Sequence, residues 1–275
     1  MIVDAHHHFW DPTRRYYPWM GDELAAIRRP YSPAELEPLL KAEGIDRSAL
    51  VQTVSDLDET REFLDTAADN EFIGGVVGWV DLTDPHIADT LAELRAGPGG
   101  TFLVGIRHQV HDEPDPRWLV RDDVQRGIQA VGDAGLAYDL LIKTRELPAA
   151  VETARRHPDM RFVLDHIAKP RIAGGPRDEE WERAMVPLAS HQNVFCKLSG
   201  MVTEARWGDW TPEDLQPYVA RSLDWFGPER CMFGSDWPVC LLAADYSRVV
   251  TTMRAIVGDS EDVFGATASR VYGLA

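Results

Sequence analysis

Short apolar runs alternate along this chain with longer stretches in which apolar residues recur at helical spacing. The apolar runs are rich in β-branched and aromatic residues. Most of them are nearly continuous, as is typical of strands that are covered on both faces. Eight runs predict strands over residues 1–9, 48–54, 72–82, 101–110, 136–143, 161–169, 193–201 and 230–238. The amphipathic stretches between them predict helices.

Three of the predicted helices carry clear start and stop signals. Each begins with a capping residue followed by proline, at Ser32, Asp84 and Thr211, and each ends at a glycine. Glu35 follows Ser32 by three residues, which predicts a capping box. These helices are predicted over residues 32–44, 84–97 and 211–227. Weaker patterns predict helices near residues 57–70, 121–134, 145–157, 177–191, 245–257 and 260–272.

Eight successive strand–helix units predict an α/β protein with the (β/α)8 architecture of a TIM-type barrel. We expect residues 1–275 to form a single barrel domain, with its active site at the C-terminal end of the strands. A doubly wound open sheet is the alternative. Such a sheet normally has a glycine-rich phosphate-binding turn after its first strand, but here that position reads AHHHFWDP.

Composition and charge narrow the classes of partner. The 275 residues carry a formal net charge of -17, which disfavours binding to nucleic acid or to an anionic membrane. We find no apolar window long enough to span a membrane and no pattern of a signal peptide. The three cysteines, Cys196, Cys231 and Cys240, suggest no disulfide framework. A reducing cytoplasm is therefore the expected location.

The first predicted strand contains three consecutive histidines, His6, His7 and His8. Side chains alternate between the two faces of a strand, so His6 and His8 share one face and His7 lies on the other. In isolation, His6 and His8 are better explained as polar groups at a barrel mouth than as metal ligands. However, His166 and Asp236 lie near the C-terminal ends of two other predicted strands. Three imidazoles and a carboxylate at one barrel mouth predict a divalent metal, with zinc as the first candidate and manganese as the alternative.

Several segments together resemble the amidohydrolase superfamily. They read DAHHHFWDP, VGWVDL, GIRHQVHDEPDPRWL, LAYDLLIK, FVLDHIAKP, NVFCKLSGM, CMFGSDWPV and DVFGATASRVYGL, and they extend over almost the whole chain. The resemblance is closest to the sugar-lactonase-like branch, which includes L-fuconolactonases, L-rhamnonolactonases and pyrone-dicarboxylate lactonases. It implies that His6 and His8 correspond to the family's first-strand H-x-H pair. It also implies that His166 and Asp236 are the sixth-strand and eighth-strand metal ligands.

The chain departs from the superfamily members that bind two metals. Those members have a bridging lysine or glutamate and a fifth-strand histidine, whereas this chain has Arg107 and His108 on strand four and Asp139 and Lys143 on strand five. We therefore expect one metal. Activity without a metal stays open, because some members of this branch are thought to need none.

The resemblance implies the hydrolysis of a sugar-acid lactone, of the L-fucono- or L-rhamnono-lactone type. Asp236 is the expected general base, and His166 is expected to assist catalysis as a metal ligand or hydrogen-bond donor. Candidate substrate contacts are Arg107, His108, Trp10 and Asp139, although Asp139 is equally explained by a salt bridge to Lys143. A metal-dependent decarboxylase and a catalytically silent binder are the alternative functions. Assembly into a homo-oligomer is left open.

Overall fold

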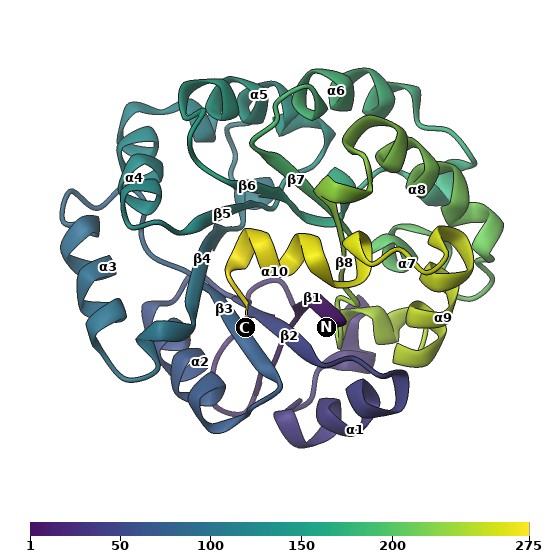
Figure 1. Ribbon diagram of the computed structural model, residues 1–275, viewed down its shortest axis with the longest axis horizontal. Helices are drawn as coiled ribbons and strands as arrows, with labels where there is room; N and C mark the ends of the chain where they lie inside the picture. Colours follow the sequence, from purple (N-terminus) through teal and green to yellow (C-terminus); the bar gives the residue numbers. More distant parts are fainter. Residues whose placement is uncertain (275) are drawn as a thin grey trace.

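The computed structural model describes residues 1–274 and shows eight parallel strands in the order of the sequence (Figure 1). The strands are β1 (Val3–His7), β2 (Arg47–Val51), β3 (Ile73–Gly78), β4 (Leu103–His108), β5 (Ala137–Leu140), β6 (Phe162–Leu164), β7 (Val194–Leu198) and β8 (Cys231–Phe233). Each strand pairs with its neighbour in the sequence, and helices surround the sheet. The predicted (β/α)8 barrel is confirmed, and the doubly wound alternative is wrong.

The α-helices connect successive strands and close the chain. They are α1 (Pro33–Glu43), α2 (Leu57–Asp69), α3 (Ile87–Ala96), α4 (Asp122–Asp133), α5 (Leu147–Arg156), α6 (Glu179–Ala189), α7 (Met201–Glu204), α8 (Pro212–Phe226), α9 (Tyr246–Val257) and α10 (Thr267–Tyr272). A π-helical segment, η10 (Asp262–Ala266), leads into α10. Short 3₁₀ turns are η1 (Asp22–Ile27), η2 (Gly100–Phe102), η3 (Val110–Asp112), η4 (Trp118–Val120), η5 (Thr144–Glu146), η6 (Asp165–Ala168), η7 (Ile172–Gly174), η8 (Pro228–Arg230) and η9 (Val239–Leu242).

The sheet closes between β1 and the segment that follows β8. The backbone N–H of Asp236 donates to the carbonyl of His6 at 2.8 Å, and that of His8 donates to the carbonyl of Trp237 at 2.7 Å. A bridge between His7 and Trp237 lies at the same place. The closure therefore ties the histidine segment directly to the segment that carries Asp236.

Helix α10 covers the end of the barrel at which the strands begin, and it crosses that end in the foreground of Figure 1. Val271 and Tyr272 of this helix pack with buried interior residues of the strands, including Val3, Val51 and Val163. This apolar layer fills the barrel interior at the N-terminal ends of the strands. A larger apolar core lies between the sheet and the surrounding helices.

The structure corrects several predicted boundaries. Most strands are shorter than their apolar runs, and β6 ends at Leu164, before His166. The third helix begins at Ile87 rather than at the predicted Asp84 cap, and the Ser32 side chain makes no capping hydrogen bond. The start of α8 is as predicted, with a capping box between Thr211 and Asp214.

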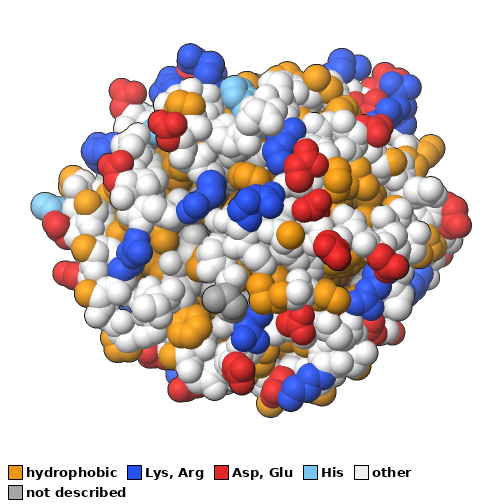
Figure 2. Space-filling model, in the orientation of Figure 1, with side chains coloured by type: hydrophobic (Ala, Val, Ile, Leu, Met, Phe, Trp, Pro, Cys, Tyr) orange, Lys and Arg blue, Asp and Glu red, His pale blue; other side chains and the backbone are white. Residues whose placement is uncertain are grey.

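The surface of the molecule is mixed in charge on the face where α10 lies. Figure 2 shows basic and acidic side chains interspersed there, with apolar groups between them. Within residues 1–274, no helix is both long and apolar enough to cross a membrane. The three cysteines are buried and unpaired.

Candidate active site

The histidines of β1 owe their direction to a bulge. Asp4 pairs with Ser48 and His7 with Leu50, so β1 advances three residues where β2 advances two. Such a bulge re-aims the side chains that follow it. Ala5 packs in the apolar barrel interior, and yet His6 also reaches the interior, one layer above it. His7 lies on the other face, where its Nε2 contacts the Ser48 hydroxyl at 2.9 Å, as the alternation predicted.

The four residues predicted to form a metal site meet at one point. The Oδ1 of Asp236 lies 3.3 Å from Nε2 of His8, 3.7 Å from Nε2 of His6 and 4.0 Å from Nε2 of His166. All four side chains are buried. His6 and His8 lie at β1 and Asp236 follows β8, so the barrel closure brings these three together, while His166 follows β6.

The donor set fits a metal ion. The Nδ1 of His8 donates to the carbonyl of Val51 at 2.7 Å, because a carbonyl can only accept. Its Nε2 therefore presents a lone pair to the Asp236 carboxylate, which also only accepts. Two acceptors this close need a cation or a proton between them. His6, His166 and Asp236 each offer a ligand atom, and these atoms lie within 4.8 Å of one another.

The electrostatic state of the site also suits a metal. Burial lowers the pKa of all three imidazoles, and that of His166 falls from 6.5 to about 4. Burial alone would raise the pKa of Asp236, but the attraction of His166 and the contact with His8 outweigh it, so that this pKa lies below its usual 3.8. At neutral pH the site holds neutral imidazoles and an ionised carboxylate, which are the ligating forms.

A charged layer that we did not predict lies directly beneath the histidines. The Oδ2 atom of Asp165 accepts a hydrogen bond from Arg107 at 2.8 Å. Its Oδ1 atom lies 3.1 Å from Nζ of Lys197 and 3.3 Å from Nδ1 of His6. Groups of this kind orient a ligating imidazole. Lys197 also binds Asp139 at 2.6 Å, so it points into the barrel and neutralises acid there. Gln52 holds the guanidinium of Arg107 through Nε at 2.9 Å.

A pocket of about 280 Å³ opens above this site. Arg107, His8, His166 and Asp236 line its floor. Its walls include residues that are not among the predicted substrate contacts, namely Trp19, Thr53, Gln109, Lys169, Glu204 and Trp207. His111 of η3 also lines the pocket and is largely buried.

Three of the predicted substrate contacts lie elsewhere. His108 stacks on Trp118 at 4.3 Å between ring centroids, and its Nε2 contacts Glu113 at 2.8 Å. Asp139 is fully buried below the site, and its predicted pairing with Lys143 is wrong because β5 ends at Leu140 and Lys197 takes that place. Neither side chain reaches the pocket above Asp236.

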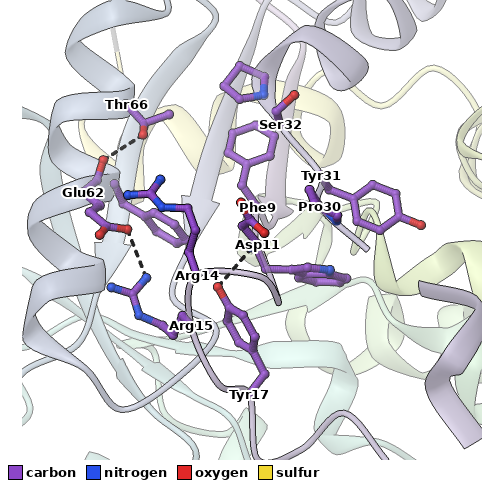
Figure 3. A pocket seen from close by; sticks show the side chains of 13 residues that line it. Phe9, Asp11, Arg14, Arg15, Tyr17, Pro30, Tyr31, Ser32, Glu62 and Thr66 are labelled. Atoms are coloured by element: carbon purple, nitrogen blue, oxygen red, sulfur yellow. Dashed lines mark hydrogen bonds and ion pairs between the residues drawn. The ribbon is translucent and has the colours of Figure 1, made fainter. Parts of the chain in front are cut away.

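Trp10, the third of these residues, lines a different cavity. That cavity has a volume of about 270 Å³ and lies between the segment after β1 and α2. Figure 3 shows its walls, with Arg14 and Glu62 on one side and Tyr31 on the other. Trp10 lies behind the active-site wall: its ring packs edge-on against Trp19 at 5.3 Å and lies 6.4 Å from the ring of His8, both distances between centroids.

A comparison with protein families decides the ancestry of this site, because the amidohydrolase family model matches residues 3–274. The chain belongs to the amidohydrolase family. The resemblance predicted from the sequence motifs is thus confirmed.

Two relatives are similar to this amidohydrolase over most of its length. An L-fucono-1,5-lactonase of Burkholderia multivorans is 40% identical over 287 residues, which cover 99% of this chain and 96% of the relative. A second L-fucono-1,5-lactonase, from Burkholderia ambifaria, is 42% identical over 246 residues, which cover 89% of this chain and 82% of the relative. The crystal structure of a Burkholderia multivorans amidohydrolase with bound zinc superposes with a TM-score of 0.92, at 37% identity and full coverage of both chains.

Proposed function

We propose that this amidohydrolase hydrolyses a sugar-acid lactone of the L-fucono-lactone type. The observation that carries the proposal is the Asp236 carboxylate, whose Oδ1 lies within 4.0 Å of three imidazoles at the floor of a pocket of about 280 Å³. The two L-fucono-1,5-lactonases with at least 40% identity support the substrate class. They favour ring opening over the decarboxylation that we considered as the alternative.

Asp236 acts as the general base in this proposal. Its carboxylate takes a proton from water while the water oxygen bonds to the lactone carbonyl carbon. When the tetrahedral intermediate collapses, the ring C–O bond breaks and Asp236 returns the proton to the leaving oxygen. The product is the open-chain hydroxy acid. The imidazole of His166 is held by the Ser199 hydroxyl at 2.9 Å, and its Nε2 lies 4.0 Å from this carboxylate.

We propose zinc as the metal, with manganese as the alternative, held by His6, His166 and Asp236 with His8 beside them. A carboxylate with so low a pKa is a weak base, and a bound divalent metal supplies what it lacks by making water more acidic and polarising the carbonyl. Neutral imidazoles without metal can instead donate hydrogen bonds to the carbonyl. A cytoplasmic location stays a prediction of the sequence, and assembly into a homo-oligomer stays open.

Acid release from a panel of aldonolactones tests the proposal. We expect wild-type protein to acidify L-fucono-lactone solutions, and the Asp236→Asn variant to lose at least about 10³-fold in kcat, because the base is gone. Circular dichroism checks that the variant is folded. Carbon dioxide release without acidification would identify a decarboxylase, and binding of lactone without turnover would identify a silent binder.

The role of the metal is tested separately. Protein prepared without a histidine tag is dialysed against a chelator, assayed, and then reloaded with zinc or manganese. Restored activity with one ion identifies the metal. Full activity of the chelated protein, with elemental analysis finding no metal, would show that the imidazoles act alone.

A further inference from the structure

The segment after β6 has an unusual backbone. His166, Ile167, Ala168 and Lys169 have φ values of 54°, 48°, 59° and 51°, so four consecutive residues other than glycine are left-handed. L-amino acids visit this region at a cost and usually one residue at a time. Strain of this kind persists only where the surrounding structure enforces it, and it concentrates at functional sites. The turn therefore points to a role beyond the placement of His166.

The turn brings a second side chain into the active-site pocket. The backbone N–H of Lys169 donates to the carbonyl of His166 at 2.8 Å, and Trp181 donates through Nε1 to the carbonyl of Ile167 at 2.6 Å. Ile167 and Ala168 are fully buried, whereas His166 and Lys169 both line the pocket. The spacing of three residues thus places an imidazole and an ammonium on the same side of the turn.

Lys169 forms an ion pair inside the pocket. Its Nζ lies 2.8 Å from Oε1 of Glu204, and the two side chains are 16% and 26% exposed. Glu204 is the last residue of α7. Trp207 lies three residues further along the chain and is 38% exposed. Its Nε1 donates a hydrogen bond to the carbonyl of Thr203 at 2.9 Å. One wall of the pocket therefore offers a donor, an acceptor and an aromatic face side by side.

The charge of this wall indicates what it recognises. An unpaired cation would attract a carboxylate or an oxyanion, but the charge of Lys169 is neutralised by Glu204. A neutral pair still has N–H groups to donate and carboxylate lone pairs to accept. Two adjacent hydroxyl groups satisfy such a pair, because one accepts from the ammonium and the other donates to the carboxylate. The exposed Trp207 ring provides apolar surface for the C–H face of a sugar ring.

We propose that Lys169 and Glu204 bind adjacent hydroxyl groups of the lactone and so determine the preference for a polyhydroxylated ring. The inference rests on the proposed lactone hydrolysis and assigns the specificity to this pair. It separates the pocket into a reacting floor, at Asp236, and a recognition wall.

The test compares two lactones with the same ring size, L-fucono-1,5-lactone and the unsubstituted δ-valerolactone. A site built to bind hydroxyl groups discriminates strongly against a substrate that lacks them. In Lys169→Met and in Glu204→Met, we expect the ratio of kcat/KM for the two lactones to fall by about 10- to 100-fold, the effect of one lost hydrogen bond to a charged group. Lys41→Met is the matched control, since Lys41 pairs with Glu37 at 2.6 Å on the exposed face of α1. Its ratio should equal that of the wild type.

Each result decides between roles. An equal fall on both lactones would overturn the proposal and make Lys169 a general electrostatic stabiliser. An unchanged ratio in both variants would overturn it as well. If Lys169→Met does not fold, as judged by its thermal melting, Glu204→Met and Lys169→Arg decide the question. Wild-type protein that opens neither lactone would refute the proposed function itself, whereas active wild type with unchanged variants would refute only this assignment.

Discussion

At the scale of single residues, the position of His166 depends on the end of β7. The Ser199 hydroxyl contacts Nδ1 of His166 at 2.9 Å, and Gly200 leaves the space that the imidazole occupies. A Cβ atom on Gly200 would lie 2.5 Å from that nitrogen, and the residue has a φ of +64°. The sequence KLSG therefore provides both a hydrogen bond and clearance for one side chain.

We predict that Gly200→Ala lowers kcat/KM for the lactone by at least about 10-fold, since the imidazole must move by an appreciable part of an ångström. Gly44→Ala is a matched control, because Gly44 has a φ of +67° with nothing within 4 Å of an added Cβ. Both variants carry the same backbone penalty of about 1–2 kcal/mol. Lactonase kinetics and urea unfolding separate the two effects. Equal activity of the two variants would show that the collision is harmless.

The convergence of His6, His8, His166 and Asp236 could be predicted from the sequence. Each follows or ends an apolar run, and the ends of parallel strands meet at one face of a barrel. Asp165 could not be predicted, although it adjoins His166. Its role depends on which cations face it from β4 and β7, and no local pattern records that.

At the scale of secondary structure elements, the boundaries around the site were the least predictable. The run RFVLDHIAK is apolar enough to predict a strand to residue 169, but β6 ends at Leu164 and a left-handed turn follows. Such a turn is usually announced by glycine or asparagine, and this one contains neither. Tertiary contacts, such as that of Trp181 with Ile167, overcome the local preference.

Three neighbouring strands place opposite charges in the barrel interior, which leads to a prediction on stability. Lys197 of β7 lies 2.6 Å from Asp139 of β5 and 3.1 Å from Asp165, next to β6, and all three are fully buried. Removing one partner of a buried ion pair costs about 3–5 kcal/mol, because a charge is left uncompensated. We therefore expect Lys197→Met to lower the free energy of unfolding by that amount.

The double variant Lys197→Met with Asp139→Asn tests the cause. In this variant Asp139 no longer carries the charge that the loss of Lys197 leaves uncompensated, and Arg107 still pairs with Asp165 at 2.8 Å. Its loss in urea unfolding should be smaller than the sum of the two single losses, by about 1–3 kcal/mol. Additive losses would mean that the ammonium contributes only packing.

At the scale of the whole molecule, the barrel has a structural end and a reactive end. The number of strand–helix units sufficed to predict the barrel. That α10 covers the end at which the strands begin was not predicted. The hydroxyl of Tyr272 in this helix donates to Asp139 at 2.8 Å, so α10 contacts the charged layer that lies below His6. Sequence periodicity reveals that a short helix exists, but the surface it covers depends on how the chain closes.

The buried imidazoles make stability depend on pH. His166 has a folded pKa of about 4, against 6.5 when unfolded, because burial disfavours its charged form. Because of this lowered pKa, the free energy of unfolding decreases as the pH falls below 6.5, and the decrease reaches about 3 kcal/mol at pH 4. Asp4 and Asp139 act in the opposite direction, since burial raises their pKa to about 6. The net slope of the wild type therefore does not isolate the imidazole.

The slope of a His166→Gln variant does isolate it. Urea unfolding at pH 7, 6, 5 and 4 in the presence of a chelator measures the free energy of unfolding without a bound metal. Between pH 6.5 and 4 the wild type should take up nearly one more proton on unfolding than the variant, so the two curves should diverge by about 1.4 kcal/mol per pH unit. Parallel curves would mean that folding does not lower the pKa of His166.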